Sequence, residues 1–80
     1  MARLSADMRR REAKRIGDNI AWHMVTGGIT KKRVAEYLGY SLPTVYLKCK
    51  DARLWTLDEL FSLCNLFNCE LTKLVGKESV

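Results

Sequence analysis

Apolar residues recur at helical spacing along the chain, and no stretch alternates apolar and polar residues as a strand would. In the first segment, Ile16, Ile20 and Met24 stand four residues apart and mark the apolar face of one helix. Ser5 can cap the start of this helix, because its hydroxyl can accept a hydrogen bond from the first turn. The glycines at residues 27–28 predict its end.

A second, shorter helix is expected between Thr30, a plausible N-cap, and Gly39. Its predicted buried face consists of Val34, Ala35 and Leu38. The small side chain of Ala35 would allow another helix to approach closely.

A third helix is expected after Ser41, which can serve as its N-cap. Pro43 then falls in the first turn, where a missing backbone N–H costs nothing. Val45 and Cys49 stand four residues apart and are predicted to point inward. A short turn containing glycine therefore joins two helices, which is the pattern of a helix-turn-helix.

The last third of the chain predicts two more helices. Thr56 and Glu59 have the spacing of a capping box, and Asn68 ends the fourth helix. A fifth short helix runs up to Gly76. The residues of these two helices expected to face the core are Leu57, Leu60, Phe61, Cys64, Phe67, Leu71 and Leu74. The pattern as a whole predicts an all-α domain of five short helices around one core.

Length and charge restrict the number of domains and the kind of partner that fit this chain. Eighty residues, 48% of them apolar, are enough for one small domain, here residues 1–80. The net charge is +5, and the positive charge is concentrated in two stretches. Residues 1–15 and residues 30–53 each carry six Lys or Arg against two acids, whereas residues 54–80 are net negative. A basic side of this kind favours nucleic acid as the partner over an evenly charged surface.

The chain has few groups that do chemistry. Cys49, Cys64, Cys69 and the single histidine, His23, lack the spacing of a zinc site, so free buried thiols and no metal are expected. His23 is expected to be partly buried in the first helix. No nucleophile has a visible base partner and no glycine-rich phosphate loop occurs, so an enzyme is not expected. No cofactor, membrane partner or small-molecule ligand is expected either. The thiols and the polar, basic start of the chain suggest a cytoplasmic protein.

Two stretches carry a resemblance to a known family: "ITKKRVAEYLGYSLPTVYLKCK", followed by "TLDELFSLCNLFNCELTKLV". Over roughly residues 16–76, the chain resembles the Cro/repressor-type (Xre-like) helix-turn-helix regulators of bacteria and phages. The resemblance implies a lambda-repressor-like fold and a DNA-binding transcription regulator, a repressor or Cro-like protein. It also implies double-stranded DNA as partner, with a homodimer on the operator possible. The family often has glutamine where this chain has Lys31.

In this family the outward face of the third helix enters the major groove. With Val45 and Cys49 inward, the helical phase turns Pro43, Thr44, Leu47 and Lys50 outward and leaves Tyr46 at the side. The predicted base contacts are Leu42, Pro43, Thr44 and Leu47. Unlike the polar residues usual in the family, Leu42, Pro43 and Leu47 would read thymine methyl groups, and Thr44 can read either a methyl group or a hydrogen-bonding edge. The alternative is that Leu42 and Leu47 are core residues or face another protein.

Phosphate contacts are expected from basic residues around this helix. Three of them, Lys31, Lys32 and Arg33, start the second helix, where backbone N–H groups also attract phosphate. The others are Tyr46, Lys50 and, in the loop after the third helix, Arg53. The basic run "RRREAKR", residues 9–15, fits a helix face that touches phosphate in part and is otherwise solvated.

Two other functions fit part of the pattern. The first is a small helical adaptor that uses the same fold to bind another regulator or RNA polymerase, supported by the apolar third helix. The second is non-specific nucleic-acid binding, which fits the charge but not the ordered helix-turn-helix. Trp22, Trp55, Leu66 and Val75 are either peripheral core residues or, if exposed together, a patch for self-association.

Overall fold

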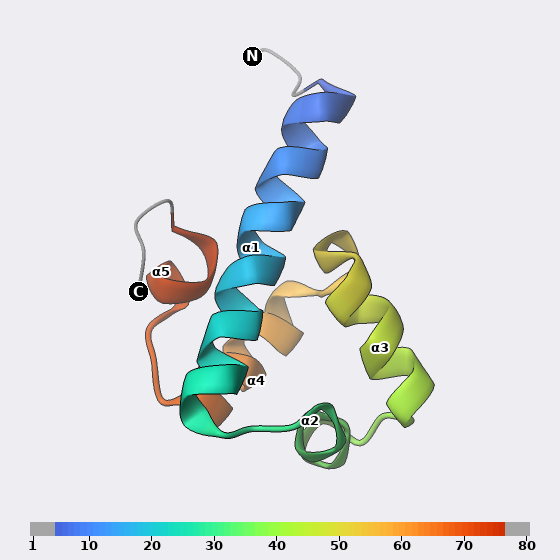
Figure 1. Cartoon of the computed structure of the whole chain (residues 1–80), viewed down its shortest axis with the longest axis vertical. Coiled ribbons are helices and arrows are strands. Elements are labelled where there is room, and N and C mark those ends of the chain that lie inside the picture. Colours follow the sequence, from blue (N-terminus) through green and yellow to red (C-terminus); the bar gives the residue numbers. More distant parts are fainter. Residues whose placement is uncertain (1–4, 77–80) are drawn as a thin grey trace.

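A computed structural model describes residues 5–76 of the chain. The five expected helices are present, together with a short 3-10 helix after the third, and the described residues contain no strand (Figure 1). The elements are α1 (Ala6–Gly27), α2 (Lys31–Leu38), α3 (Leu42–Lys50), η1 (Ala52–Leu54), α4 (Leu57–Phe67) and α5 (Leu71–Val75). The prediction of an all-α, five-helix domain is therefore confirmed.

The caps explain why the helices begin and end where they do. Ser5 accepts a hydrogen bond from the Met8 N–H (3.1 Å), and Thr30 accepts one from the Arg33 N–H (3.1 Å). Gly28 ends α1 in the left-handed conformation, with φ at +67°, a region that glycine adopts without strain. These local signals were all visible in the sequence.

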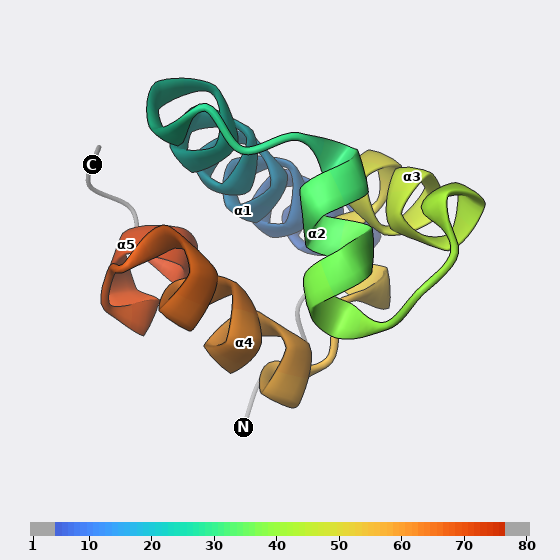
Figure 2. The ribbon, with the colours of Figure 1, turned by 90° about the horizontal axis from the view of Figure 1, so that it is seen from below.

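The long helix α1 is the spine of the fold (Figure 1). α3 and η1 pack on one side of it and α5 on the other, while α2 lies against α3 and α4 (Figure 2). Polar contacts fasten α5 to α1: the Asn19 side-chain amide donates to the Leu74 carbonyl (2.9 Å), and Arg15 donates to the Val75 carbonyl (3.0 Å). The last described helix is thereby held against the middle of α1.

The core lies where these helices meet. Its buried apolar residues are Ile20, Met24, Val34, Ala35, Val45, Ala52, Trp55, Leu63, Cys64 and Leu74. Leu38, Leu60 and Phe67, also expected in the core, are only partly buried but pack against it. His23 is half-buried and stacks on Phe67, with 5.7 Å between the ring centroids. Trp55 is 7% exposed and therefore belongs to the core rather than to a self-association patch.

The predicted core face of α4 is wrong in part. Leu57 is 57% exposed and Phe61 is 47% exposed, whereas Leu63, which was not predicted, is completely buried. The cause is that α4 has apolar residues around most of its circumference, so two apolar stripes fit the helical period. Packing against α1, α2 and α5 selects the stripe that contains Leu63 and Cys64.

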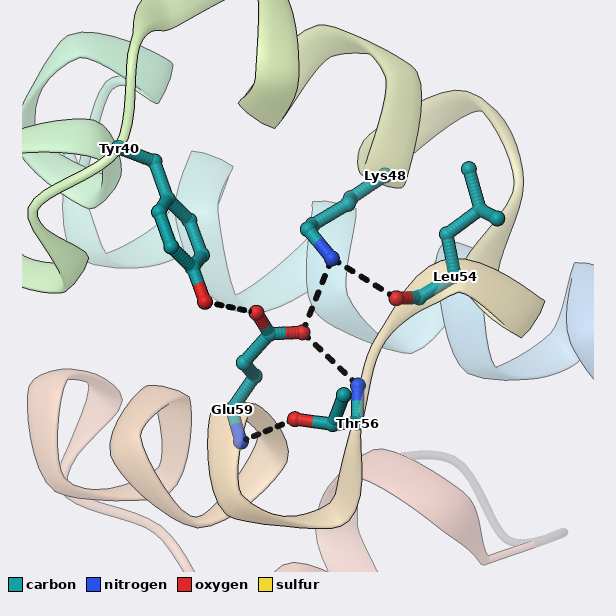
Figure 3. Close-up of polar contacts among 5 residues, drawn as sticks. All are labelled: Tyr40, Lys48, Leu54, Thr56 and Glu59. Carbon is teal, nitrogen blue, oxygen red and sulfur yellow. Dashed lines mark hydrogen bonds and ion pairs between the residues drawn. The ribbon is translucent and has the colours of Figure 1, made fainter.

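One buried carboxylate, Glu59, joins four parts of the fold (Figure 3). Its side chain is 8% exposed and accepts hydrogen bonds from the Tyr40 hydroxyl, the Lys48 ammonium (3.1 Å) and the Thr56 N–H (2.8 Å). The Glu59 N–H donates in return to the Thr56 hydroxyl (3.1 Å), which completes the expected capping box. Lys48 also donates to the Leu54 carbonyl (2.9 Å). The turn before α3, α3 itself, η1 and the start of α4 are thus tied to one group.

The protonation of Glu59 follows from these contacts. Burial by itself would raise the pKa of Glu59, but the hydrogen bonds from Tyr40, Thr56 and Lys48 outweigh it and hold the pKa below its ordinary value of 4.5. A carboxyl whose pKa is lower in the folded state stabilises the fold above its unfolded pKa. That contribution is lost as the pH falls through the folded pKa.

We predict that Glu59→Ala lowers the free energy of unfolding by about 3–5 kcal/mol, the usual cost of removing one member of a buried ion pair. Urea denaturation at pH 7 measures the loss, and the gap to wild type should narrow in acid. The control is Asp58→Ala, which removes an exposed charge from the same turn of α4 and should cost less than about 1 kcal/mol. Equal losses in the two variants would contradict the role of the buried carboxylate.

We predict that Ala35→Leu destabilises the protein by about 1–3 kcal/mol, because Ala35 is 6% exposed in a helix that packs against both α3 and α4. The neighbouring Glu36 is exposed on the same helix, so Glu36→Leu should change stability by less than about 0.5 kcal/mol. Thermal unfolding compares the two. An Ala35→Leu protein that melts at the wild-type temperature would show that the helices do not crowd this residue.

Candidate nucleic-acid interface

The helix-turn-helix consists of α2, a turn of three residues and α3 (Figure 2). Gly39 opens the turn in the left-handed conformation with φ at +75°, and the Tyr40 N–H returns to the Ala35 carbonyl (2.9 Å). Ser41 then caps α3 by accepting from the Thr44 N–H (3.4 Å). Val45, completely buried, anchors α3 to the core. The turn and the anchor together fix which face of α3 points outward.

The outward face of α3 is largely apolar. Leu47 is 61% exposed, Leu42 is 37% exposed, and Pro43 and Lys50 are also exposed. Leu47 is therefore not a core residue. Thr44 differs from the expectation: it is half-buried, and its hydroxyl lies 2.9 Å from the Ser41 hydroxyl. Helical phase alone predicted an exposed Thr44 because it takes no account of this contact with the capping residue Ser41.

Several of the predicted phosphate-binding residues surround one groove between α1, the start of α2 and α3. The groove holds about 800 Å³, and its lining includes Lys31, Lys32, Leu42, Tyr46 and Lys50. The Lys31 ammonium lies 5.5 Å from the centre of the Tyr46 ring, a distance at which a cation is attracted to an aromatic face. The structure thus brings the start of α2 and the side of α3 together as one basic rim.

A second groove follows the other side of α3, between α1 and η1. It is lined by Leu47, Lys50 and Arg53, among others, so Lys50 belongs to both grooves. Arg53 is exposed but bound to Asp51 through two hydrogen bonds (2.9 and 2.8 Å). These bonds lower the pKa of the Asp51 carboxyl, so the pair is neutral at physiological pH.

Arg33 lines neither groove; its guanidinium lies 5.5 Å from the centre of the Tyr37 ring. Lys48, also on α3, is directed into the fold and held by Glu59 (Figure 3). Sequence reasoning did not assign Lys48, although its spacing of three residues from buried Val45 places it near the inner face. Its positive charge is therefore paired with the Glu59 carboxylate inside the protein.

The other polar residues offer little reactive chemistry. Burial raises the pKa of Cys64 to about 11 and also raises that of Cys49, so both thiols are protonated at neutral pH. Burial, aided by Lys73, lowers the pKa of His23. Within residues 5–76, no three His, Cys, Asp or Glu side chains lie close enough together to hold a metal ion.

Over the same described residues, no helix combines the length and the apolar character needed to cross a membrane.

An all-helical domain with a short turn between α2 and α3, an exposed α3 and a basic rim has the architecture of the helix-turn-helix DNA-binding proteins. The family model of the Cro/C1-type HTH DNA-binding domain matches residues 20–76, and the chain belongs to this family. The match includes the last turns of α1 and all of the other helices. No curated protein and no solved structure matches the chain. The family membership supports a DNA-binding regulator.

Proposed function

We propose that this protein is a sequence-specific transcription regulator, a repressor or Cro-like protein, that inserts α3 into the major groove of its operator. The observation that carries the proposal is the exposed apolar face of α3 with basic residues on both of its sides. A major groove is wide enough to admit one helix, and phosphates border it on both sides. Cations on either side of α3 match that arrangement.

The apolar face would contribute the sequence reading. Leu42, Pro43 and Leu47 can contact the C5-methyl group of thymine, the one apolar group on the major-groove edge of a base pair. With its hydroxyl near Ser41, Thr44 would contribute mainly its methyl group. The operator is therefore expected to be rich in thymine at the contacted positions.

The basic residues would contribute affinity. The proposed phosphate contacts are Lys31, Lys32, Arg33, Tyr46, Lys50 and Arg53. At the start of α2, backbone N–H groups that lack partners within the helix add a positive field. Two copies on a palindromic operator would place their α3 helices about 34 Å apart, one turn of DNA. The setting would be the cytoplasm of a bacterium or a phage-infected cell.

A second function, an adaptor that docks on another regulator or on RNA polymerase, is favoured by the same exposure of Leu42 and Leu47. A gel-shift series over several salt concentrations separates the two functions. A regulator binds a selected duplex with strong salt dependence, whereas an adaptor that uses these leucines for protein contacts binds DNA poorly at every salt concentration.

We predict that Lys31→Ala and Lys50→Ala each weaken binding to all duplexes by a similar factor. Each should also flatten the plot of log affinity against log salt by about 0.9, the contribution of one phosphate. Lys73→Ala is the control, because Lys73 is exposed on α5 and lines neither groove. A variant with the wild-type slope would remove that lysine from the phosphate contacts.

We predict that Leu47→Ala lowers the affinity for a duplex selected from random sequences by about 1–3 kcal/mol while leaving non-specific binding and thermal stability unchanged. Uracil in place of the contacted thymine deletes only the methyl group and should have the same effect. The two changes together should cost less than their sum, because they remove one shared contact.

The matched control for this prediction is Leu57→Ala, since Leu57 is similarly exposed but lies on α4. It should leave the affinity for the selected duplex unchanged. If Leu47→Ala spares DNA binding but abolishes binding to a protein partner, the adaptor is the correct function.

A further inference from the structure

The N-terminal part of α1 extends the domain beyond its family core. The family match begins at residue 20, whereas α1 begins at Ala6, and its first turns project past the other helices (Figure 1). This segment, residues 6–19, is roughly 21 Å long at 1.5 Å per residue. Every residue from Ser5 to Arg11 is exposed. These first turns therefore add little to the core.

The second half of the extension is nevertheless attached to the body of the protein. Ala13 and Ile16 pack against the core, and the Arg15 and Asn19 side chains hydrogen-bond to carbonyls at the end of α5. On the side facing η1, a Cβ placed on Gly17 would lie 3.8 Å from the Ala52 Cβ, so the two backbones run close together. The projecting turns therefore continue a helix whose following turns are packed and hydrogen-bonded to the rest of the fold.

One face of this extension lies in the groove along α3. Arg10 and Lys14 line it together with Leu47, Lys50 and Arg53, in a space of about 790 Å³. The small residues Ala13, Gly17 and Ala21 of α1 also line this groove. The cations of the extension thus stand on the same side of the molecule as the exposed end of α3.

We propose that Arg10 and Lys14 bind the DNA backbone just outside the sequence contacted by α3, so that α1 lengthens the DNA footprint. This inference rests on the proposed function. The groove carries four cations, Arg10, Lys14, Lys50 and Arg53, against two acids, Asp18 and Asp51. Its surplus of positive charge complements a phosphate backbone.

The existing ion pairs do not prevent such contacts. Arg10 pairs with Asp7 at 2.5 Å and Lys14 with Asp18 at 2.9 Å, and all four side chains are at least 65% exposed. Exposed pairs of this kind contribute little to stability, so phosphates can replace the acids at small cost. One helical turn separates the two cations by about 6 Å, close to the rise of two base pairs along one strand, about 6.8 Å.

The test compares two duplexes that carry the same selected site, one ending at the site and one with ten random base pairs on each side. Binding is measured between 50 and 200 mM salt for wild type and for Arg10→Gln/Lys14→Gln. The matched control is Arg9→Gln/Arg11→Gln, which removes two charges from the same exposed turns at positions that do not line the groove. Helical circular dichroism verifies that all three proteins are folded.

With two additional phosphates, wild type should bind the long duplex with a salt slope steeper by about 1.8, which makes its preference for that duplex fall about 12-fold between 50 and 200 mM salt. Arg10→Gln/Lys14→Gln should lose this preference but bind the short duplex as wild type does, and Arg9→Gln/Arg11→Gln should keep the preference. Hydroxyl-radical footprinting should show wild-type protection beyond the selected site.

Four results would overturn the inference. Equal losses in both double variants would mean that general charge, and not the groove, attracts the flanking DNA. Protection limited to the selected site would mean that Arg10 and Lys14 do not contact the flanking DNA. The groove would then bind another partner, such as an acidic protein surface. If wild type binds both duplexes equally and Lys31→Ala weakens that binding, the extended footprint is refuted and the proposed function is supported. Wild type that binds neither duplex would refute both.

Discussion

The helix-turn-helix depends on one buried carboxylate. α2, α3 and η1 are all short, and short helices are unstable unless packing fixes them. Val45 supplies the apolar anchor of α3, but a single buried valine does not set the angle of a helix. Glu59 adds bonds of defined direction to Tyr40 before α3, to Lys48 near its end and to the Thr56 backbone at the start of α4. The position of α3 therefore follows from the satisfaction of a buried charge.

This arrangement divides the surface of α3 between two tasks. Lys48 is turned inward and neutralised, so the exposed part of the helix carries Lys50 as its cation and is otherwise apolar or neutral. Most of the positive charge near α3 is supplied by neighbouring elements, above all the start of α2 and the α1 extension. The proposed base contacts and most of the proposed phosphate contacts thus come from different parts of the chain.

The local features could be predicted from the sequence because they depend on a few adjacent residues. The caps at Ser5, Thr30, Ser41 and Thr56 each require one hydroxyl before a helix, and all four are present. The face of α4 could not be predicted, because Leu57 and Phe61 fit the helical period as well as Leu63 does and only the neighbouring helices decide between them. The pairing of Lys48 with Glu59 joins residues eleven positions apart, so local spacing could not predict it either. The outward direction of Leu47 was predicted correctly because Val45 is buried, and a residue two positions further along a helix lies nearly opposite.

The inward orientation of Lys48 has a consequence for how such a protein changes over evolution. Because the outer side chains at Leu42, Pro43 and Leu47 take no part in the network that positions α3, they can be exchanged without loosening the fold. They also carry no charge, so their exchange leaves the general attraction to DNA almost unchanged. Under the proposed function, single substitutions on this face would change the operator preference, while the framework and the proposed phosphate contacts would be inherited intact.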